Sequence, residues 1–420
     1  MPSLALCPRD GLVKKNSSRR RFLKGSALTG AACVLGRGML PLPTRLSVIV
    51  VGAGAFGGWT ALELLRKGAK VTLVDAWGPG NSRASSGGET RIIRATYGPS
   101  RIYTQLAAEA LRLWQENEQR WGLKLFFRTG VLWMAGKDDS YERAALPLLR
   151  DAEVRSERLA ASDCAKRWPQ IQFDEISWSI YEPDFGYLAA RRGCEAVFHA
   201  FLKEGGEYRQ AQAAPGPITG NRLAGITVAP GENLTADAYV FACGPWLGKV
   251  FPFLASVIHP TRQEVFFFGT AAGDLRFTDA QLPVWIDNSR RGEHLYYGIP
   301  GNHWRGFKIA DDTRGPVIDP TTMERQISAA GLAAARTYLS MRFPGLADAP
   351  LLENRVCQYE NSPDQNFIAD RHPEATNVWI VGGGSGHGFK HGPAIGGLVS
   401  DAVLGIKAPP QEFLLKRLYA

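Results

Sequence analysis

The sequence has few of the features that mark several classes of protein. Its 420 residues include only six cysteines, which are too few and too scattered for a disulfide scaffold. No uninterrupted apolar run reaches the roughly 20 residues of a membrane-spanning helix, and repeats and low-complexity tracts are also missing. With 45% hydrophobic and 21% charged residues, the chain can bury a large core, which excludes a disordered or fibrous protein.

The body of the chain also lacks an excess of basic charge. The net charge is +9, but residues 1–40 hold eight Lys or Arg residues and one acidic residue. That segment therefore carries +7, and the other 380 residues carry +2. Because the basic charge is confined to one end, we expect no nucleic-acid partner.

The basic N-terminal segment has the layout of an export signal. Ser18–Lys24 reads SRRRFLK and precedes a weakly apolar stretch from Gly25 to Gly36. The paired arginines resemble the twin-arginine motif, and a basic region followed by apolar and small residues is typical of a secretory signal rather than of a plain basic tail. We therefore interpret residues 1–40 as a twin-arginine signal segment. This predicts the twin-arginine export machinery as a partner and a periplasmic or other extracytoplasmic location.

Residues 47–75 have the pattern of a dinucleotide-binding unit. Ser47–Val51 is a β-branched run that suits a buried parallel strand. A GAGAFG turn follows, then a helix over Thr60–Lys67 ending at Gly68, and a second strand over Lys70–Val74. A GxGxxG turn between strand and helix, with an acid 23 positions after its first glycine, predicts a site for FAD or NAD. This unit alone does not distinguish the two cofactors.

The residues of this turn have distinct physical roles. Gly52 permits the tight turn, Gly54 lets the backbone approach a pyrophosphate, and Gly57 lets the helix pack on the strand. The anion binds the free N–H groups at the helix N-terminus, and the acid at the end of the second strand can accept the ribose hydroxyls. The predicted cofactor-binding residues here are Gly52, Gly54, Ala55, Phe56, Gly57 and Asp75.

Three later segments, taken with this unit, resemble a known family. They contain GETRIIR at Gly88–Arg94, YYGIP and GFKI within Tyr296–Ile309, and RVCQYENSPD and GGGSGHGFK within Arg355–Lys390. From Ser47 to about residue 415, the chain is similar to the amine-oxidising flavoproteins of the D-amino-acid-oxidase-like superfamily, typified by monomeric sarcosine oxidase, N-methyltryptophan oxidase and pipecolate oxidase. The resemblance implies FAD as the cofactor.

The resemblance also implies roles for single residues. Thr90 and Arg91 would lie along the isoalloxazine, and Cys357 would form a thioether to the flavin 8α-methyl, so that FAD is covalently attached. Arg94 and Lys390 would bind the substrate carboxylate.

Further matches lie around the reacting centre. Lys308 would hold a cation near the flavin, where O2 is reduced, and Tyr297 would line the substrate pocket. The glycine-rich loop would lie against the cofactor, through Gly384, Gly386, His387, Gly388 and Lys390.

Two positions differ from the family pattern. Gly87 stands where relatives have a histidine that assists flavin attachment, and Asp312 stands where sarcosine oxidase has an active-site histidine. A carboxylate near the substrate favours a cationic or polar group on it. We therefore count Asp312 as a catalytic candidate, together with Lys308, Arg91 and Tyr297, and expect a different substrate.

Two other chemistries do not fit the glycine-rich loop. GGSGH lacks the last glycine of a nucleophile elbow. His387 and His391 are four residues apart but have no third ligand or acidic base with them. We therefore expect no metal site.

The resemblance implies an α/β fold with two interleaved domains. A Rossmann-type FAD-binding domain would take residues 46–130, 185–255 and 355–420. An α+β substrate domain would take residues 131–184 and 256–354 and be built on a large mixed or antiparallel sheet. Apolar runs at Val131–Met134, Val265–Phe268 and Val284–Asn288 are typical of strands of that sheet.

The resemblance leads to one reaction and leaves two alternatives open. The expected reaction oxidises a secondary amino acid, N-methyl or cyclic, or a related amine to an imine by hydride transfer to flavin N5, with O2 reduced to H2O2. An exported amine or D-amino-acid dehydrogenase that passes electrons to a quinone or carrier is the alternative enzyme, and a non-catalytic flavin-binding module is the other. In each case we expect a small-molecule ligand and a monomer.

Overall fold

The computed structural model describes residues 45–302 and 305–419. The predicted signal segment therefore lies outside the described residues. None of the helices in the described ranges combines the length and the apolar character needed to cross a membrane. The chain from Arg45 onward forms one compact unit.

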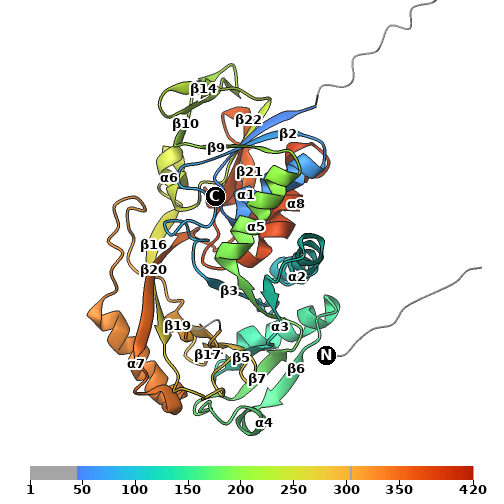
Figure 1. The fold of residues 1–420 in the computed structure, drawn as a ribbon. Helices are drawn as coiled ribbons and strands as arrows, with labels where there is room; N and C mark the ends of the chain where they lie inside the picture. Colours follow the sequence, from blue (N-terminus) through green and yellow to red (C-terminus); the bar gives the residue numbers. More distant parts are fainter. Residues whose placement is uncertain (1–44, 303–304, 420) are drawn as a thin grey trace, which may run out of the picture. The chain divides into compact units, whose positions relative to one another are not determined.

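A six-stranded sheet holds the dinucleotide unit, in the strand order β21-β22-β15-β1-β2-β9 (Figure 1). All neighbours in it run parallel except β21, which pairs antiparallel with β22. The chain leaves β1 toward β2 and β9 on one side and returns to β15 and β22 on the other, so the carboxyl end of β1 is a topological switch point. The strands are β1 (Ser47–Val51), β2 (Lys70–Asp75), β9 (Glu207–Gln210), β15 (Ala238–Phe241), β21 (Ile368–His372) and β22 (Ala375–Gly382).

Alternate residues of β1 face two different layers, as a pleated strand requires. Val48 and Val50 pack in one core cluster with the helices, whereas Ile49 and Val51 pack in another with a small antiparallel sheet. The helices of the first layer are α1 (Ala55–Arg66), α2 (Arg101–Trp121), α5 (Ala190–Lys203) and α8 (Gly392–Val403). The small sheet consists of β10 (Ala213–Pro215), β13 (Ile226–Val228) and β14 (Glu232–Leu234). A hairpin of β11 (Ile218–Thr219) and β12 (Arg222–Leu223) connects β10 to β13 along the chain.

An eight-stranded sheet has the order β20-β16-β19-β18-β17-β5-β7-β6. It is mixed, because β17 and β5 are parallel while the other neighbours are antiparallel. Its strands are β5 (Val131–Ala135), β6 (Glu157–Ala160), β7 (Trp178–Glu182), β16 (His259–Phe268), β17 (Val284–Asn288), β18 (Tyr296–Ile299), β19 (Phe307–Asp311) and β20 (Leu351–Asn361).

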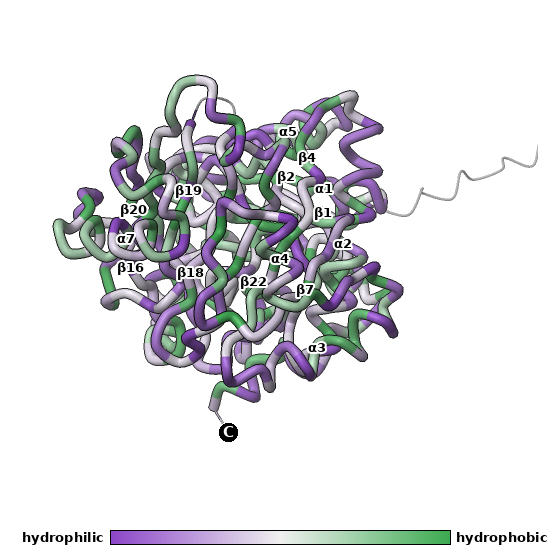
Figure 2. The backbone as a smooth tube through the Cα atoms, turned by 90° about the horizontal axis from the view of Figure 1, so that it is seen from below, coloured by the Kyte–Doolittle hydropathy of each residue, from purple (hydrophilic) through white to green (hydrophobic). Residues whose placement is uncertain are grey.

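Shorter elements complete the described chain. A three-stranded sheet joins β3 (Thr90–Ile93), β8 (Gly186–Ala189) and β4 (Phe126–Phe127). The helices α3 (Ser140–Asp151) and α5 each bury only some of their residues, and Figure 2 shows hydrophilic and hydrophobic segments mixed throughout the chain. The remaining helices are α3 (Ser140–Asp151), α4 (Ala161–Arg167), α6 (Leu247–Val250), α7 (Ala329–Arg342) and the 3-10 turns η1 (Gly244–Trp246), η2 (Pro252–Leu254), η3 (Pro344–Leu346), η4 (Phe389–His391), η5 (Gln411–Phe413) and η6 (Leu415–Leu418).

The predicted α/β fold with a large mixed sheet is confirmed, and so are its three predicted strands. Val284–Asn288 has the predicted bounds, whereas Val265–Phe268 is only the end of the longer β16. The first helix begins at Ala55 instead of Thr60, because Gly57 and Gly58 are helical. The division into FAD-binding and substrate domains stays a proposal, and β20 runs across its boundary at residue 355.

Candidate active site

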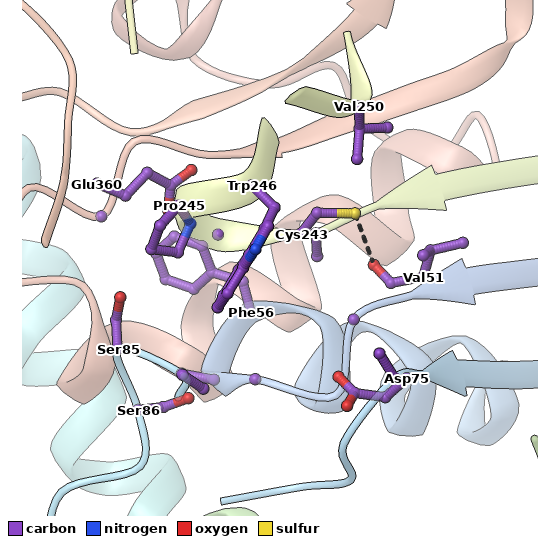
Figure 3. A pocket seen from close by; sticks show the side chains of 18 of the residues that line it. Val51, Phe56, Asp75, Ser85, Ser86, Cys243, Pro245, Trp246, Val250 and Glu360 are labelled. Carbon is purple, nitrogen blue, oxygen red and sulfur yellow. Dashed lines mark hydrogen bonds between the residues drawn. The ribbon is translucent and has the colours of Figure 1, made fainter. Parts of the chain in front are cut away.

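A cavity of about 600 Å³ opens at the carboxyl end of β1 (Figure 3). Its walls come from the glycine-rich turn after β1, the end of β2, the turn after β15, strand β20 and the loop after β22. Open α/β sheets bind ligands at such switch points. The lining includes Gly52, Gly54, Ala55, Phe56, Asp75, Arg91, Trp246, Tyr359, Glu360, Gly384, Gly386 and Gly388.

The three glycines of the first turn have different neighbours. Gly52 has a φ of +106°, and a Cβ there would lie 2.3 Å from the Ala242 carbonyl oxygen. A Cβ on Gly57 would lie 1.9 Å from the Gly52 oxygen, so this glycine is needed for packing and does not line the cavity. A Cβ on Gly54 would project toward the Ser86 hydroxyl, 3.2 Å away, and narrow the cavity.

The N-terminus of α1 faces this cavity. No side chain caps it, and its first turn contains no acidic residue. Its N–H groups are therefore free to bind an anion. Beside it, the Asp75 carboxylate accepts N–H bonds from Ala53 (2.7 Å), Trp77 (2.9 Å) and Gly78 (2.7 Å). These three bonds leave room for about one further donor, so Asp75 has less free acceptor capacity than the two ribose hydroxyls require.

Arg91 and Cys357 lie side by side between β3 and β20. The Arg91 guanidinium donates to the carbonyl oxygens of Thr90 (2.8 Å) and Ser85 (2.5 Å) and lies 3.7 Å from the Cys357 Sγ. The structure thus brings these two predicted residues together, with Arg91 lining the cavity and Cys357 immediately behind it.

Lys308 approaches the same place from β19. Its side chain is only 3% exposed, and Nζ donates to the Thr90 carbonyl oxygen at 3.1 Å. Nζ also lies 5.6 Å from the centre of the Tyr297 ring. Burial, and then the positive charge of Arg91, lower the pKa of Lys308 to about 7. Lys308 therefore changes charge near neutral pH.

Tyr297 and Asp312 meet around Tyr359, a residue that the sequence analysis did not select. The Tyr359 hydroxyl donates to Asp312 Oδ1 at 2.8 Å, and Arg314 lies 3.3 Å from Oδ2. Burial, and then the Asp312 charge, raise the pKa of Tyr297 to about 12. Tyr359 lies two residues after Cys357 on one strand, and this spacing was the signal that could have identified it.

The two predicted carboxylate-binding cations share another tyrosine. Lys390 Nζ donates to the Tyr97 hydroxyl and to the His387 carbonyl oxygen, both at 2.9 Å. The Arg94 guanidinium lies 4.3 Å from the Tyr97 ring centre and 4.6 Å from that of Trp133. Burial, and then the charge of Arg94, hold the pKa of Lys390 well below its ordinary value. A bound carboxylate would supply the missing counter-charge.

The two histidines of the glycine-rich loop also converge on Tyr97. His391 Nε2 lies 2.8 Å from the Tyr97 hydroxyl and His387 Nδ1 lies 3.4 Å from it, while His387 Nε2 faces the Gln365 carbonyl oxygen. Burial, and then the charge of Lys390, lower the pKa of both histidines well below the usual value. Both imidazoles are therefore neutral at pH 7.

The predicted site residues thus form two connected groups. The dinucleotide turn except Gly57, together with Asp75, Arg91 and the loop glycines, lines the cavity. A second group lies outside its lining and connects to it through Arg91, Tyr359 and the loop glycines: Thr90, Tyr297, Lys308, Asp312, Cys357, His387 and Lys390, with Arg94 beside Tyr97. The sequence analysis missed Tyr97, Tyr359, Glu360 and Trp246.

Comparisons with known proteins identify the family of the chain and its export signal. A family model described as FAD dependent oxidoreductase matches residues 47–402. A twin-arginine translocation signal model matches residues 16–36, which confirms the predicted export signal and its extracytoplasmic destination.

Relatives and solved structures resemble almost the whole chain. Monomeric sarcosine oxidase of Bacillus sp. (strain B-0618) is 32% identical, over 86% of this chain and 93% of its own. N-methyl-L-tryptophan oxidase of Salmonella agona (strain SL483) is 28% identical, over 89% and 98%. The fold matches L-proline dehydrogenase from P. horikoshii with a TM-score of 0.76 at 20% identity, over 88% and 96%. The chain belongs to the FAD-dependent oxidoreductases of this family, in the group of CH–NH-oxidising enzymes that contains monomeric sarcosine oxidase.

Proposed function

We propose that the protein oxidises a secondary amino acid, N-methyl or cyclic, or a related amine to the imine, with O2 as the electron acceptor and H2O2 as the second product. The observation that carries this proposal is the arrangement of two buried lysines, each with an arginine near it. Lys390 and Arg94 meet at Tyr97 on one side, and Lys308 lies beside Thr90 and Arg91 on the other. The FAD cavity is connected to both.

The cavity fits FAD by its size, its uncapped helix N-terminus and its open glycine floor. The turn after β1 would hold the pyrophosphate, Asp75 a ribose hydroxyl, and Arg91 the flavin ring. When bound, FAD supplies the hydride acceptor at its N5 and passes the electron pair on to O2. Cys357, 3.7 Å from Arg91, would provide the covalent attachment.

Arg94 and Lys390 would bind and orient the substrate carboxylate. A carboxylate placed between them would offset the Arg94 charge that lowers the proton affinity of Lys390, so binding keeps Lys390 protonated. Fixing the carboxylate holds the adjacent C–H bond in one orientation, and such positioning accounts for much of the rate enhancement in an enzyme. Loss of a hydride from this carbon and of a proton from the amine nitrogen converts the substrate to an imine. Water then hydrolyses the imine.

Asp312 would select the rest of the substrate. Its carboxylate is held by Tyr359 and Arg314 and lies near Tyr297. A negative group at this place favours a substrate with a cationic or hydrogen-bond-donating group, so the preferred substrate would differ from sarcosine.

The test is an anaerobic screen of N-methyl, cyclic and D-amino acids against the purified holoprotein, scored by loss of the oxidised flavin absorbance. Reduced protein is then mixed with O2 or with a quinone in a stopped-flow instrument. The proposal predicts bleaching by a secondary amino acid and faster reoxidation by O2. Faster reoxidation by the quinone would make the protein a dehydrogenase, and no bleaching by any amine would contradict the amine-oxidising function.

A further inference from the structure

Glu360 is a buried carboxyl group in the wall of the FAD cavity (Figure 3). It follows Tyr359 on β20, and its side chain is 6% exposed. Oε1 accepts the Gly383 N–H at 3.0 Å, while its own carbonyl oxygen accepts the Ser385 N–H at 2.8 Å. A Cβ on Gly382 would lie 2.2 Å from Oε1. Glu360 therefore holds the start of the glycine-rich loop at two points.

The carboxyl group has no cationic partner. In the ranges that the structure describes, the proton affinity of this carboxyl group is shifted by its burial and by the N–H groups of Gly383 and Gly384. No Lys or Arg shifts it. Burial raises the pKa of Glu360 to about 7. Together these observations make the neutral acid accessible at physiological pH.

The surrounding elements offer little else that titrates. Burial, and then the charges of Asp75 and Glu360, raise the pKa of Cys243, after β15, so Cys243 is a neutral thiol. From β20, Tyr359 has a pKa raised well above its usual value and is neutral too. Lys249 also lines the cavity, but its Nζ is paired with Asp319 at 2.6 Å.

The cofactor brings negative charge into the same cavity. The two phosphates of FAD are ionised at all pH values near neutrality, so an ionised Glu360 in the same cavity would repel them. A protonated carboxyl instead presents an O–H donor to a phosphate or ribityl oxygen. Binding FAD should therefore favour the protonated form.

We propose that Glu360 is a cofactor-positioning residue that keeps its proton when FAD binds and donates it as a hydrogen bond to the cofactor. The proposal rests on the FAD site assigned above. By linkage, FAD affinity is constant while free Glu360 is protonated, and it weakens as the pH rises through about 7, by up to about tenfold per pH unit.

The experiment measures FAD affinity between pH 6 and 8.5 by flavin fluorescence. The parent for this comparison is the C357A/K308M variant, in which binding is reversible and the other cofactor-facing side chain with a pKa of about 7 is absent. The parent should lose affinity above about pH 7. Glu360→Gln, which keeps a donor but cannot ionise, should bind FAD with a flat pH profile. Glu182→Gln removes another buried carboxyl, one that is outside the cavity lining, and should keep the parental profile.

A flat parental profile, or a Glu360→Gln profile that still falls with pH, would overturn the role of Glu360 alone. If no FAD binds at any pH, the cofactor site itself is wrong and this proposal fails with it. A second measurement uses the unmutated holoprotein: its infrared spectrum at pH 7.5 should contain a protonated-carboxyl band that Glu360→Gln lacks. Absence of that band would equally contradict the proposal.

Discussion

At the scale of single residues, the site depends on buried cations whose charge is not balanced by carboxylates in direct contact. Lys308 donates a hydrogen bond to a backbone carbonyl oxygen, and Lys390 donates to a tyrosine hydroxyl and a carbonyl oxygen. Each is costly to keep charged, so each is expected to gain most from an anion that arrives with the substrate or the cofactor.

Lys308→Met should slow flavin reoxidation by O2 by roughly a hundredfold, the order found when one charge-stabilising group is removed from an active site. Flavin reduction by the amine should change much less. In the wild type, reoxidation should slow as the pH rises through about 7, where Lys308 loses its charge, or higher if the bound flavin raises its pKa. Stopped-flow absorbance measures both half-reactions, with the exposed Lys203→Met as the control. Equal effects on the two half-reactions would remove Lys308 from this role.

Tyr97→Phe should weaken the binding of a carboxylate substrate or inhibitor about tenfold, because Lys390 loses a hydrogen-bond acceptor and an unsatisfied buried group costs about 1–3 kcal/mol. The rise should be in KM more than in kcat. Tyr103→Phe is the matched control: its ring lies 5.3 Å from that of Tyr97, but its hydroxyl accepts the Phe367 N–H. If both variants changed KM equally, the tyrosine would only fill space.

The sequence could identify most of these residues but not their contacts. Arg91 and Cys357 are 266 positions apart, and Tyr97 and Lys390 are 293 apart, so only the folded chain reveals that they meet. Tyr97 was also missed because a tyrosine beside a glycine after a strand is typical of a packed turn.

At the scale of elements, the helix layer on the six-stranded sheet depends on close packing between α1 and α8. Gly396 of α8 lies against Trp59 of α1, where a Cβ would be 2.7 Å from Trp59 backbone and side-chain atoms. The neighbouring Gly397 has open space at the Cβ position. The two glycines are therefore a matched pair.

Gly396→Ala should destabilise the protein by roughly 1–3 kcal/mol through overpacking, and it should lower the melting temperature of the holoprotein. Gly397→Ala should raise stability by roughly 0.5–1 kcal/mol, because alanine favours the helix. Differential scanning calorimetry would compare the melting temperatures of the two variants with that of the wild type. A reversed order would show that the two helices are not packed as described.

Element boundaries were predictable where local chemistry decides them. Ser47–Val51 is a β-branched run that ends at a glycine with φ of +106°, and its bounds were predicted from that pattern. The start of α1 was missed because its glycines normally disfavour a helix, and here helix packing outweighs that preference. The pairing of β16 with β20 joins strands about 90 residues apart, a register that no local pattern contains.

At the scale of the whole molecule, the FAD-dependent family and the twin-arginine signal lead us to propose that the protein is exported with FAD already bound. Covalent attachment would prevent cofactor loss after export. Acid precipitation of the wild type should therefore leave the yellow colour in the pellet, whereas Cys357→Ser should release FAD into the supernatant. Cys194→Ser, at a buried cysteine of α5, should behave as the wild type does. Release of FAD from the wild type would contradict covalent attachment through Cys357.

The most direct test of carboxylate binding by Arg94 and Lys390 compares two amines that differ only by a carboxylate, such as a cyclic amino acid and its decarboxylated analogue. The measured quantity is the rate at which each amine reduces the flavin of the holoprotein without oxygen. The amino acid should bleach the flavin, and the analogue should do so at least a hundredfold more slowly. In Arg94→Met, most of this difference in rate should be lost. Equal rates for the two amines in the wild type would contradict it, because Arg94 and Lys390 would then not hold the substrate.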